Sequence, residues 1–210
     1  MKTVVLKFGG TSVGSTEKIK KVAEIIGNYK KKNNKVIVVS SAMSGVTNDL
    51  IKKSLKISQN FSDAEYDVLV SSGEQVSCSL IAGRLIHKGF KARSWLAWQI
   101  PILTDGTHKN SRINRLYKNK IIKYLNEGGI PIITGFQGIN NIERITTIGR
   151  GGSDASAIVL AKFFKADKCI IYTDVEGVFT TDPNKLKKAK KIKVISYEEM
   201  LEMASLGAKV

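Results

Sequence analysis

Near the start of the chain stands the stretch Thr3-Val4-Val5-Leu6-Lys7-Phe8-Gly9-Gly10-Thr11-Ser12-Val13-Gly14, and it decides the fold class. It begins with a mostly apolar run of the length of a buried strand, and the glycines behind that run predict a loop. A helix is predicted after the loop, because Ile19, Val22 and Ile26 recur at the three- and four-residue spacing of one helix face. A buried strand, a glycine loop and an amphipathic helix in this order indicate an α/β protein.

The alternation of strands and helices continues along the whole chain. Further strands are predicted at residues 35–40, 92–96, 130–134, 145–148 and 168–173, with helices between most of them. Ser62 and Glu65 form a capping box for a helix that we expect to break at residues 71–73 and then resume. Residues 104–114 are polar and predict a mobile loop. The pattern predicts a three-layer αβα sandwich with a mainly parallel central sheet and no domain boundary within residues 1–210.

The composition is ordinary for a soluble globular protein except for its charge. A total of 34 Lys and Arg stand against 18 Asp and Glu, which gives a formal net charge of +16. Aromatic residues are few and do not alternate with the lysine runs, so the stacking platform of a single-strand nucleic-acid binder is missing. The charge therefore indicates lysine-rich solvated faces, and a nucleic-acid-binding protein is the less favoured interpretation.

The two cysteines and the apolar segments indicate a cytoplasmic location. Cys78 and Cys169 lie far apart in apolar surroundings, which is typical of reduced core residues and not of a disulfide framework or a metal site. No apolar run reaches the length of a membrane span.

Polar and glycine-rich segments follow the predicted strands, at the carboxyl ends where open α/β sheets bind ligands. Lys7 and Gly9 end the first strand, and Gly149-Arg150-Gly151-Gly152-Ser153-Asp154 follows the strand at 145–148. Glycines let backbone N–H groups approach phosphate oxygens, and a following helix favours negative charge at its start. We expect these ends to meet at one edge and to bind an anion. Their spacing matches neither the dinucleotide fingerprint nor the phosphate loop that ends in Gly-Lys-Ser/Thr.

Six blocks of the sequence resemble those of aspartate kinases, within the amino-acid kinase family, in the order and spacing of that family. The blocks are residues 7–13, 40–43, 72–74, 149–154, 172–178 and 207–210, and the resemblance covers essentially the whole chain. It implies transfer of the γ-phosphoryl group of ATP, with Mg²⁺, to the β-carboxylate of L-aspartate, the first step of lysine, threonine and methionine biosynthesis. It also implies a cytoplasmic homo-oligomer with no nucleic-acid or membrane partner.

The resemblance also implies roles for particular residues. Lys7, Asp154 and Lys209 are the implied catalytic residues, since phosphoryl transfer depends on aligned charges. The implied substrate-binding residues are Ser41, Thr47, Glu74, Phe136, Arg150, Gly151, Gly152 and Ser153. The implied nucleotide-binding residues are Lys7, Phe8, Gly9, Gly10, Thr173, Asp174, Phe179, Thr180, Thr181, Asp182, Pro183, Asn184 and Lys209. No metal ligands are assigned to the protein, as is usual for magnesium bound with a nucleotide.

Simpler interpretations exist for several of these residues when each is taken alone. Glu74 fits the favourable position of an acid at the start of a resumed helix, and Thr47 and Ser153 fit helix caps. For the aspartate kinase interpretation, Glu74 would hold the substrate's ammonium group and Arg150 its carboxylate through the planar guanidinium. His87 and His108 have no partner spacing and are predicted to lie on the surface.

Two departures from the family leave alternatives open. Asn184 stands where the family usually has an arginine, and the family continues beyond Val210 with the rest of the nucleotide-binding part and, in most members, regulatory ACT modules. We therefore expect a kinase domain that is incomplete at its C-terminal end and lacks an ACT domain. One alternative is a related kinase for another acidic substrate, such as acetylglutamate, glutamate or a nucleoside monophosphate. Another is a truncated or partner-completed fragment without activity.

Overall fold

A five-stranded parallel sheet forms the centre of the computed structural model, which describes residues 1–149, 151–173, 177, 180, 186, 188–192, 195, 196 and 199. The strand order is β3-β6-β2-β1-β9, and every neighbouring pair is parallel. The strands are β1 (Thr3–Phe8), β2 (Lys35–Ser40), β3 (Ala92–Trp95), β6 (Ile130–Thr134) and β9 (Lys168–Tyr172). Because all five run the same way, the carboxyl ends of β1, β2 and β6 lie together at one edge.

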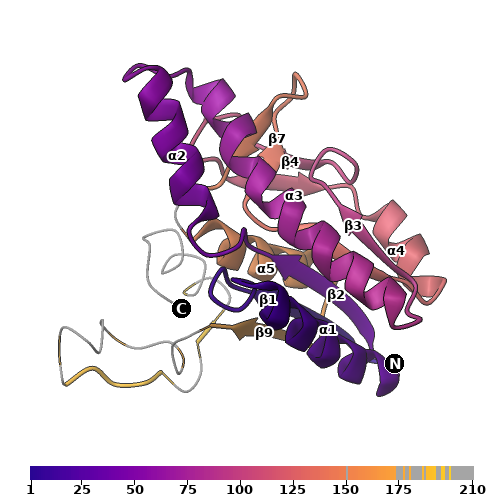
Figure 1. Ribbon diagram of the computed structural model, residues 1–210. Coiled ribbons are helices and arrows are strands. Elements are labelled where there is room, and N and C mark those ends of the chain that lie inside the picture. The colour runs from indigo at the N-terminus through magenta and orange to yellow at the C-terminus, as the bar shows by residue number, and fades with distance from the viewer. Residues whose placement is uncertain are drawn as a thin grey trace.

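Helices cover both faces of this sheet, so the predicted αβα sandwich is confirmed. On one face α1 (Thr16–Lys31) and α3 (Asp63–His87) pack against Leu6 and Phe8. On the other face α5 (Gly152–Phe163) packs on β1 and α4 (Asn119–Asn126) packs on β6, and both helices share one core with Val5. Alternate residues of β1 thus feed two separate hydrophobic cores, as the two-residue period of a strand requires. Figure 1 shows α1 and α3 side by side in front of the strands.

A second, smaller sheet lies beside the first and corrects two predictions. Its strands are β4 (Ile102–Thr104), β5 (Ile113–Leu116), β7 (Gln137–Ile139) and β8 (Ile145–Thr147), in the order β5-β4-β7-β8. The strand expected near residue 145 therefore belongs to this sheet, antiparallel to β7, and not to the central parallel one. The polar stretch 104–114 is not a free loop either, because its two ends lie in β4 and β5 and its middle bonds to α3.

The break expected in the third helix is absent, and α3 runs unbroken through residues 71–73. The hydroxyls of Ser71 and Ser72 donate to carbonyls of their own helix, those of Val68 and Leu69, which leaves the helix ladder intact. Gly73 is there for close packing, since an added Cβ would lie 3.0 Å from the Cβ of Ala42. A glycine between two serines resembles a turn in sequence but here serves a helix contact.

The cap predicted at Thr47 is wrong, and the cap predicted at Ser62 stands at the right residue but lacks its side-chain hydrogen bond. Helix α2 (Val46–Ile57) has Gly45 as its N-cap, in the left-handed region at φ +86°, so Thr47 lies inside the first turn. Ser62 does precede α3, but its side chain makes no capping hydrogen bond. Among the described residues, no helix is both long and apolar enough to cross a membrane.

Candidate active site

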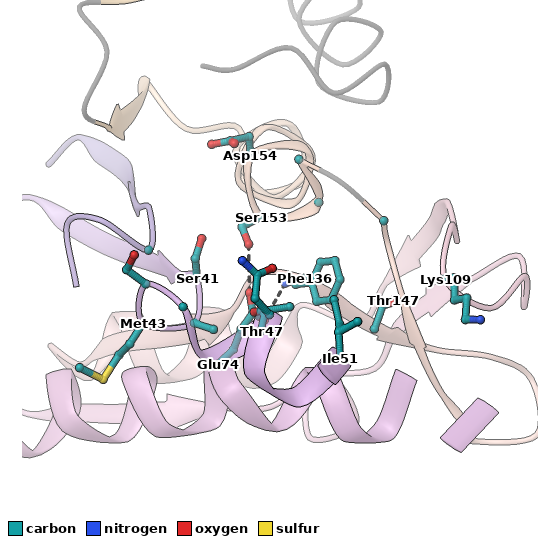
Figure 2. A pocket seen from close by; sticks show the side chains of 18 of the residues that line it. Ser41, Met43, Thr47, Ile51, Glu74, Lys109, Phe136, Thr147, Ser153 and Asp154 are labelled. Atoms are coloured by element: carbon teal, nitrogen blue, oxygen red, sulfur yellow. Dashed lines mark hydrogen bonds between the residues drawn. The ribbon is translucent and has the colours of Figure 1, made fainter. Parts of the chain in front are cut away.

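A cavity of about 680 Å³ opens where the carboxyl ends of β1, β2 and β6 face the small sheet and the start of α5. Its walls come from the loops after β1, β2 and β6, the start of α2, the first half of α3, the segment at Lys109, the end of β8 and the glycine loop before α5. Figure 2 shows side chains from these regions turned toward one space. The edge of the sheet at which polar segments were predicted to gather is therefore the edge that carries the cavity.

Lys7 and Asp154 form a buried ion pair at this cavity. The Lys7 ammonium lies 2.6 Å from Oδ1 of Asp154, and the two side chains are 6% and 12% exposed. Within the described residues this oxygen has no hydrogen-bond partner, so the contact is an ion pair. Asp154 lies in the first turn of α5, where the helix dipole favours an acid. The pair places a charge-compensated cation next to Gly9, where an added Cβ would lie 3.4 Å from Nζ of Lys7.

Glu74 is the second charged group of the cavity, and it is almost completely buried at 1% exposure. Its Oε2 accepts the backbone N–H of Phe136 at 2.7 Å, and its Oε1 accepts the hydroxyl of Ser153 at 3.0 Å. Burial raises the pKa of Glu74 to about 8, although these hydrogen bonds and Lys7 act in the opposite direction. A carboxyl group with a pKa raised by burial and a fixed orientation is well suited to receive a cationic group from a ligand.

The two loops that follow β1 and β2 are locked together beside Lys7. The N–H of Ser44 donates to the carbonyl of Gly10 at 3.2 Å. A Cβ at Gly10 would lie 2.9 Å from the carbonyl oxygen of Ala42, so only glycine allows this approach. Gly151, the N-cap of α5, has a φ of +74° in the left-handed region. These glycines bring backbone groups to the cavity wall, as the sequence pattern predicts.

Most of the predicted substrate-binding residues that the structure describes line this one cavity, together with part of the predicted nucleotide site. The lining residues that were predicted are Lys7, Gly10, Ser41, Thr47, Glu74, Phe136, Gly151, Gly152, Ser153 and Asp154. Phe8 does not line it but stacks on Tyr172 at 4.7 Å, and the N–H of Gly9 donates to the carbonyl of Tyr172.

The remaining predictions for the nucleotide lie farther along the chain. Thr173 follows β9 and is half-buried, and Thr180 bonds to Lys190. The predicted residues outside the described part of the chain are Arg150, Asp174, Phe179, Thr181, Asp182, Pro183, Asn184 and Lys209.

Several lining residues were not predicted. They are Ala42, Met43, Ser44, Gly45, Asn48, Ile51, Tyr66, Lys109, Thr147 and Gly149. Ala42, Met43 and Gly149 lie within the blocks that carry the resemblance, and Ser44 directly follows one, so they could have been included on that ground. Tyr66 and Lys109 carry no signal in the sequence, since they reach the cavity only through the packing of α3 on residues 107–111. His108 was predicted to lie on the surface, but it is half-buried and its Nδ1 lies 2.7 Å from Oδ2 of Asp67.

The described residues provide no dedicated metal site. Within the described part of the chain, no group of three or more His, Cys, Asp or Glu residues could hold a metal ion. Of the two acids that line the cavity, Asp154 contacts Lys7 and Glu74 accepts two hydrogen bonds. Both acids are thus already engaged by groups of the chain itself.

The fold and the site together define a ligand-binding α/β protein: a parallel αβα sandwich with a buried lysine, two glycine loops and a buried acidic group at one sheet edge. The chain matches the amino acid kinase family over residues 2–210 and belongs to that family. It is 53% identical to an aspartokinase of Rickettsia conorii and 51% identical to one of Geobacillus stearothermophilus. These matches cover 100% of this chain and 53% and 52% of the two relatives.

Solved structures of aspartate kinases have the same fold. An aspartate kinase from Synechocystis aligns with a TM-score of 0.78 at 41% identity, over 99% of this chain and 34% of that chain. Aspartokinase III from E. coli, in complex with aspartate and ADP, aligns with a TM-score of 0.77 at 29% identity, over 91% of this chain and 53% of that chain. The chain spans about half the length of the curated relatives it matches.

Proposed function

We propose that this chain carries the acceptor site of an aspartate kinase, which transfers the γ-phosphoryl group of ATP to the β-carboxylate of L-aspartate. One observation carries the proposal: the buried carboxyl group of Glu74 shares a cavity with the Lys7–Asp154 pair. An acceptor with a free ammonium group would supply the cation that Glu74 lacks. The same cavity would then bring the acceptor's carboxylate toward Lys7.

Lys7 acts in this proposal as the cation on the transferred phosphoryl group. Its ammonium is held by Asp154 at 2.6 Å and lies over the glycine loop, so it is aligned before the reaction. Phosphoryl transfer gains most from such alignment, because the protein forms no covalent bond with the group. Ser41, Thr47 and the backbone at residues 151–153 would bind the acceptor's polar groups from the other walls.

The part of the proposal that concerns the nucleotide rests on the family resemblance. We assign Arg150 to the acceptor's carboxylate, Lys209 to the phosphates and Asp174 with residues 179–184 to the nucleotide, on their place in the family's motifs. ATP would arrive as its magnesium complex, with phosphate oxygens supplying most of the ligands. The product would enter lysine, threonine and methionine biosynthesis in the cytoplasm, and the chain would work as a homo-oligomer.

Trapping of the acyl phosphate with hydroxylamine tests the proposal directly. ATP-dependent hydroxamate formation is compared for L-aspartate, L-glutamate and N-acetyl-L-glutamate, with the Lys7→Ala variant and with Lys52→Ala as a matched control. Lys52 is an exposed lysine on α2, so its loss should leave the rate unchanged. We expect product with L-aspartate alone, and none from the Lys7→Ala variant.

A second version of the assay tests whether the reaction needs the part of the relatives that lies beyond the matched region. The 210-residue chain is tested alone and joined to the part of the Geobacillus stearothermophilus relative that lies beyond the matched region. Activity only in the joined form would support the acceptor site and assign the missing contribution to the added part. A folded chain that phosphorylates N-acetyl-L-glutamate in preference to L-aspartate would instead favour a related kinase. The acetylated amine of that substrate carries no charge and would not need Glu74.

A further inference from the structure

A second buried acid lies on the same face of α3 as Glu74. Asp67 precedes Glu74 by seven residues, which is about two helix turns, and its exposed fraction is 0%. It does not line the cavity. A buried carboxylate is unfavourable unless hydrogen bonds or cations compensate it. The groups that bond to Asp67 therefore identify the segments that it holds in place.

Three separate groups from outside α3 converge on this carboxylate. His108 lies with Nδ1 2.7 Å from Oδ2, and the hydroxyl of Thr147 donates to Oδ1 at 2.5 Å. The backbone N–H of Lys109 is shared between the two oxygens, at 3.2 and 3.1 Å. Asp67 thus fastens both residues 107–109 and the end of β8 to α3. An apolar residue at this position could fill the space but could not form hydrogen bonds with these three groups.

The segments that Asp67 fastens form one end of the cavity. Thr147, Gly149 and Lys109 line it, and Figure 2 shows Thr147 and Lys109 together at the end opposite Met43. The N–H of Ser111 donates to the carbonyl of Thr147 at 2.9 Å. At Gly149 an added Cβ would lie 3.0 Å from the carbonyl oxygen of Lys109, so residues 109–111 pack directly on the start of the glycine loop.

From that point the contacts continue to the acceptor groups. The N–H of Gly152 donates to the carbonyl of Gly149 at 3.0 Å, and Gly152 is followed by Ser153, which donates to Glu74. The N–H of Ile148 donates to the carbonyl of Phe136, whose own N–H bonds Glu74. Asp67 and Glu74 therefore hold opposite ends of the same loop, two turns apart on one rigid helix.

We propose that Asp67 is a positioning residue for the acceptor: through Thr147 and residues 107–109 it holds Gly149, and with it residues 151–154, in the binding position. The inference rests on the proposed function for the identity of the acceptor. It requires no contact between Asp67 and any ligand. Because binding groups must be held within a fraction of an ångström, loosening of this support should weaken acceptor binding and leave the nucleotide largely unaffected.

Hydrogen–deuterium exchange tests the structural part of this inference without any substrate. Asp67→Asn keeps the size of the side chain, and Thr147→Val removes one donor with little change of shape. Glu24→Gln is the matched control, because Glu24 is an exposed acid on α1 whose partner, Lys88, does not line the cavity. We expect peptides covering residues 105–112 and 144–156 to exchange about tenfold faster in the first two variants only.

Calorimetric titration with L-aspartate and, separately, with ATP tests the functional part. Asp67→Asn should weaken L-aspartate binding about tenfold and change ATP binding by less than about twofold. In the double variant Asp67→Asn/Thr147→Val, the loss of binding free energy for L-aspartate should be smaller than the sum of the two single losses. The reason is that both changes act on the same Asp67–Thr147 hydrogen bond. Unchanged exchange at residues 144–156, or equal weakening by Glu24→Gln, would overturn the proposal.

The two possible failures are separable. A wild-type chain that binds no L-aspartate contradicts the proposed function. Wild-type binding that Asp67→Asn leaves unchanged contradicts the role of Asp67 alone.

Discussion

A buried cation and a buried carboxyl group govern the site at the scale of single residues. Lys7 has its partner within the chain, in Asp154, whereas Glu74 has hydrogen-bond donors and only a more distant cation. Removal of the Lys7 side chain therefore leaves the carboxylate of Asp154 without its cation. Removal of the Glu74 side chain leaves the N–H of Phe136 and the hydroxyl of Ser153 without their acceptor. Changes at Lys7 should appear mainly in stability and rate, and changes at Glu74 mainly in pH dependence and acceptor binding.

Replacement of Lys7 by Met should destabilise the fold as well as abolish the reaction. The carboxylate of Asp154 would remain buried without its cation, which costs about 3 kcal/mol of unfolding free energy. The double variant Lys7→Met/Asp154→Leu should recover most of that loss and stay inactive. Urea denaturation followed by circular dichroism measures both variants. A Lys7→Met chain as stable as wild type would show that the pair adds nothing to the fold.

The raised pKa of Glu74 sets the direction of two pH effects. Its pKa is about 8 in the folded chain against an ordinary value of 4.5, so between these pH values the folded state holds a proton that the unfolded state has lost. The stability contributed by this group in the ligand-free chain is therefore fully present below pH 4.5 and is lost as pH rises through about 8. In the Glu74→Gln variant, the free energy of unfolding should not show this decrease as the pH rises.

Acceptor binding should show the opposite dependence on pH. An ammonium group needs the ionised carboxylate, so binding must first remove the proton from Glu74. The affinity for L-aspartate should rise about tenfold per pH unit below the pKa of Glu74 and level off near pH 8. Titration calorimetry at pH 6, 7 and 8 in buffers of different ionisation enthalpy measures the affinity and the released proton. Equal affinity across this range would contradict an ammonium–Glu74 contact.

At the scale of elements, α3 is the part of the fold that organises the site. Asp67, Ser71 and Glu74 are buried on the helix, and each bonds to a different segment beyond it. The carbonyl of Ser71 accepts the side-chain N–H of Gln137 at 3.1 Å, between the two acids. The helix was predicted to be broken at this place, but it must be continuous, because a turn would separate the two carboxylates.

Two glycines of α3 should respond in opposite ways to replacement by alanine. At Gly83 an added Cβ meets nothing within 4 Å, so Gly83→Ala should raise the free energy of unfolding by about 0.5–1 kcal/mol through helix propensity. At Gly73 it would lie 3.0 Å from Ala42 and 3.1 Å from Val46, so Gly73→Ala should lower it by about 1–2 kcal/mol. Thermal unfolding of both variants in parallel gives the comparison. Stabilisation by Gly73→Ala would contradict the close packing of α2 on α3.

At the scale of the whole molecule the net charge of +16 should make stability depend on salt. Repulsion among lysines disfavours the compact state at low ionic strength, and screening relieves it. The urea midpoint should therefore rise between about 10 and 200 mM NaCl, since the Debye length falls over this range from about 30 Å to less than 10 Å. Lys52→Gln/Lys53→Gln, which removes two exposed charges, should show a smaller rise. A midpoint that falls with salt would mean that attractive ion pairs dominate.

The sequence by itself determined those features whose cause lies within one segment. Strands β1, β2, β6 and β9 follow from their own apolar runs, and α1 follows from its amphipathic spacing. The glycine loops and the polar strand ends were likewise visible, and Lys7, Glu74 and Ser153 were placed through the family's motifs. Local propensity and hydrophobic period are sufficient for such features, because neighbouring residues supply the interactions.

Only the tertiary structure decided which distant segments meet. Asp67 bonds to His108 and Thr147, which are 41 and 80 residues away, and no period or motif links the three. The same holds for β8, which joins the small sheet and not the central one, and for the continuity of α3 through Gly73. In each case the free energy comes from burial and hydrogen bonds between segments, which a residue's own neighbours do not encode.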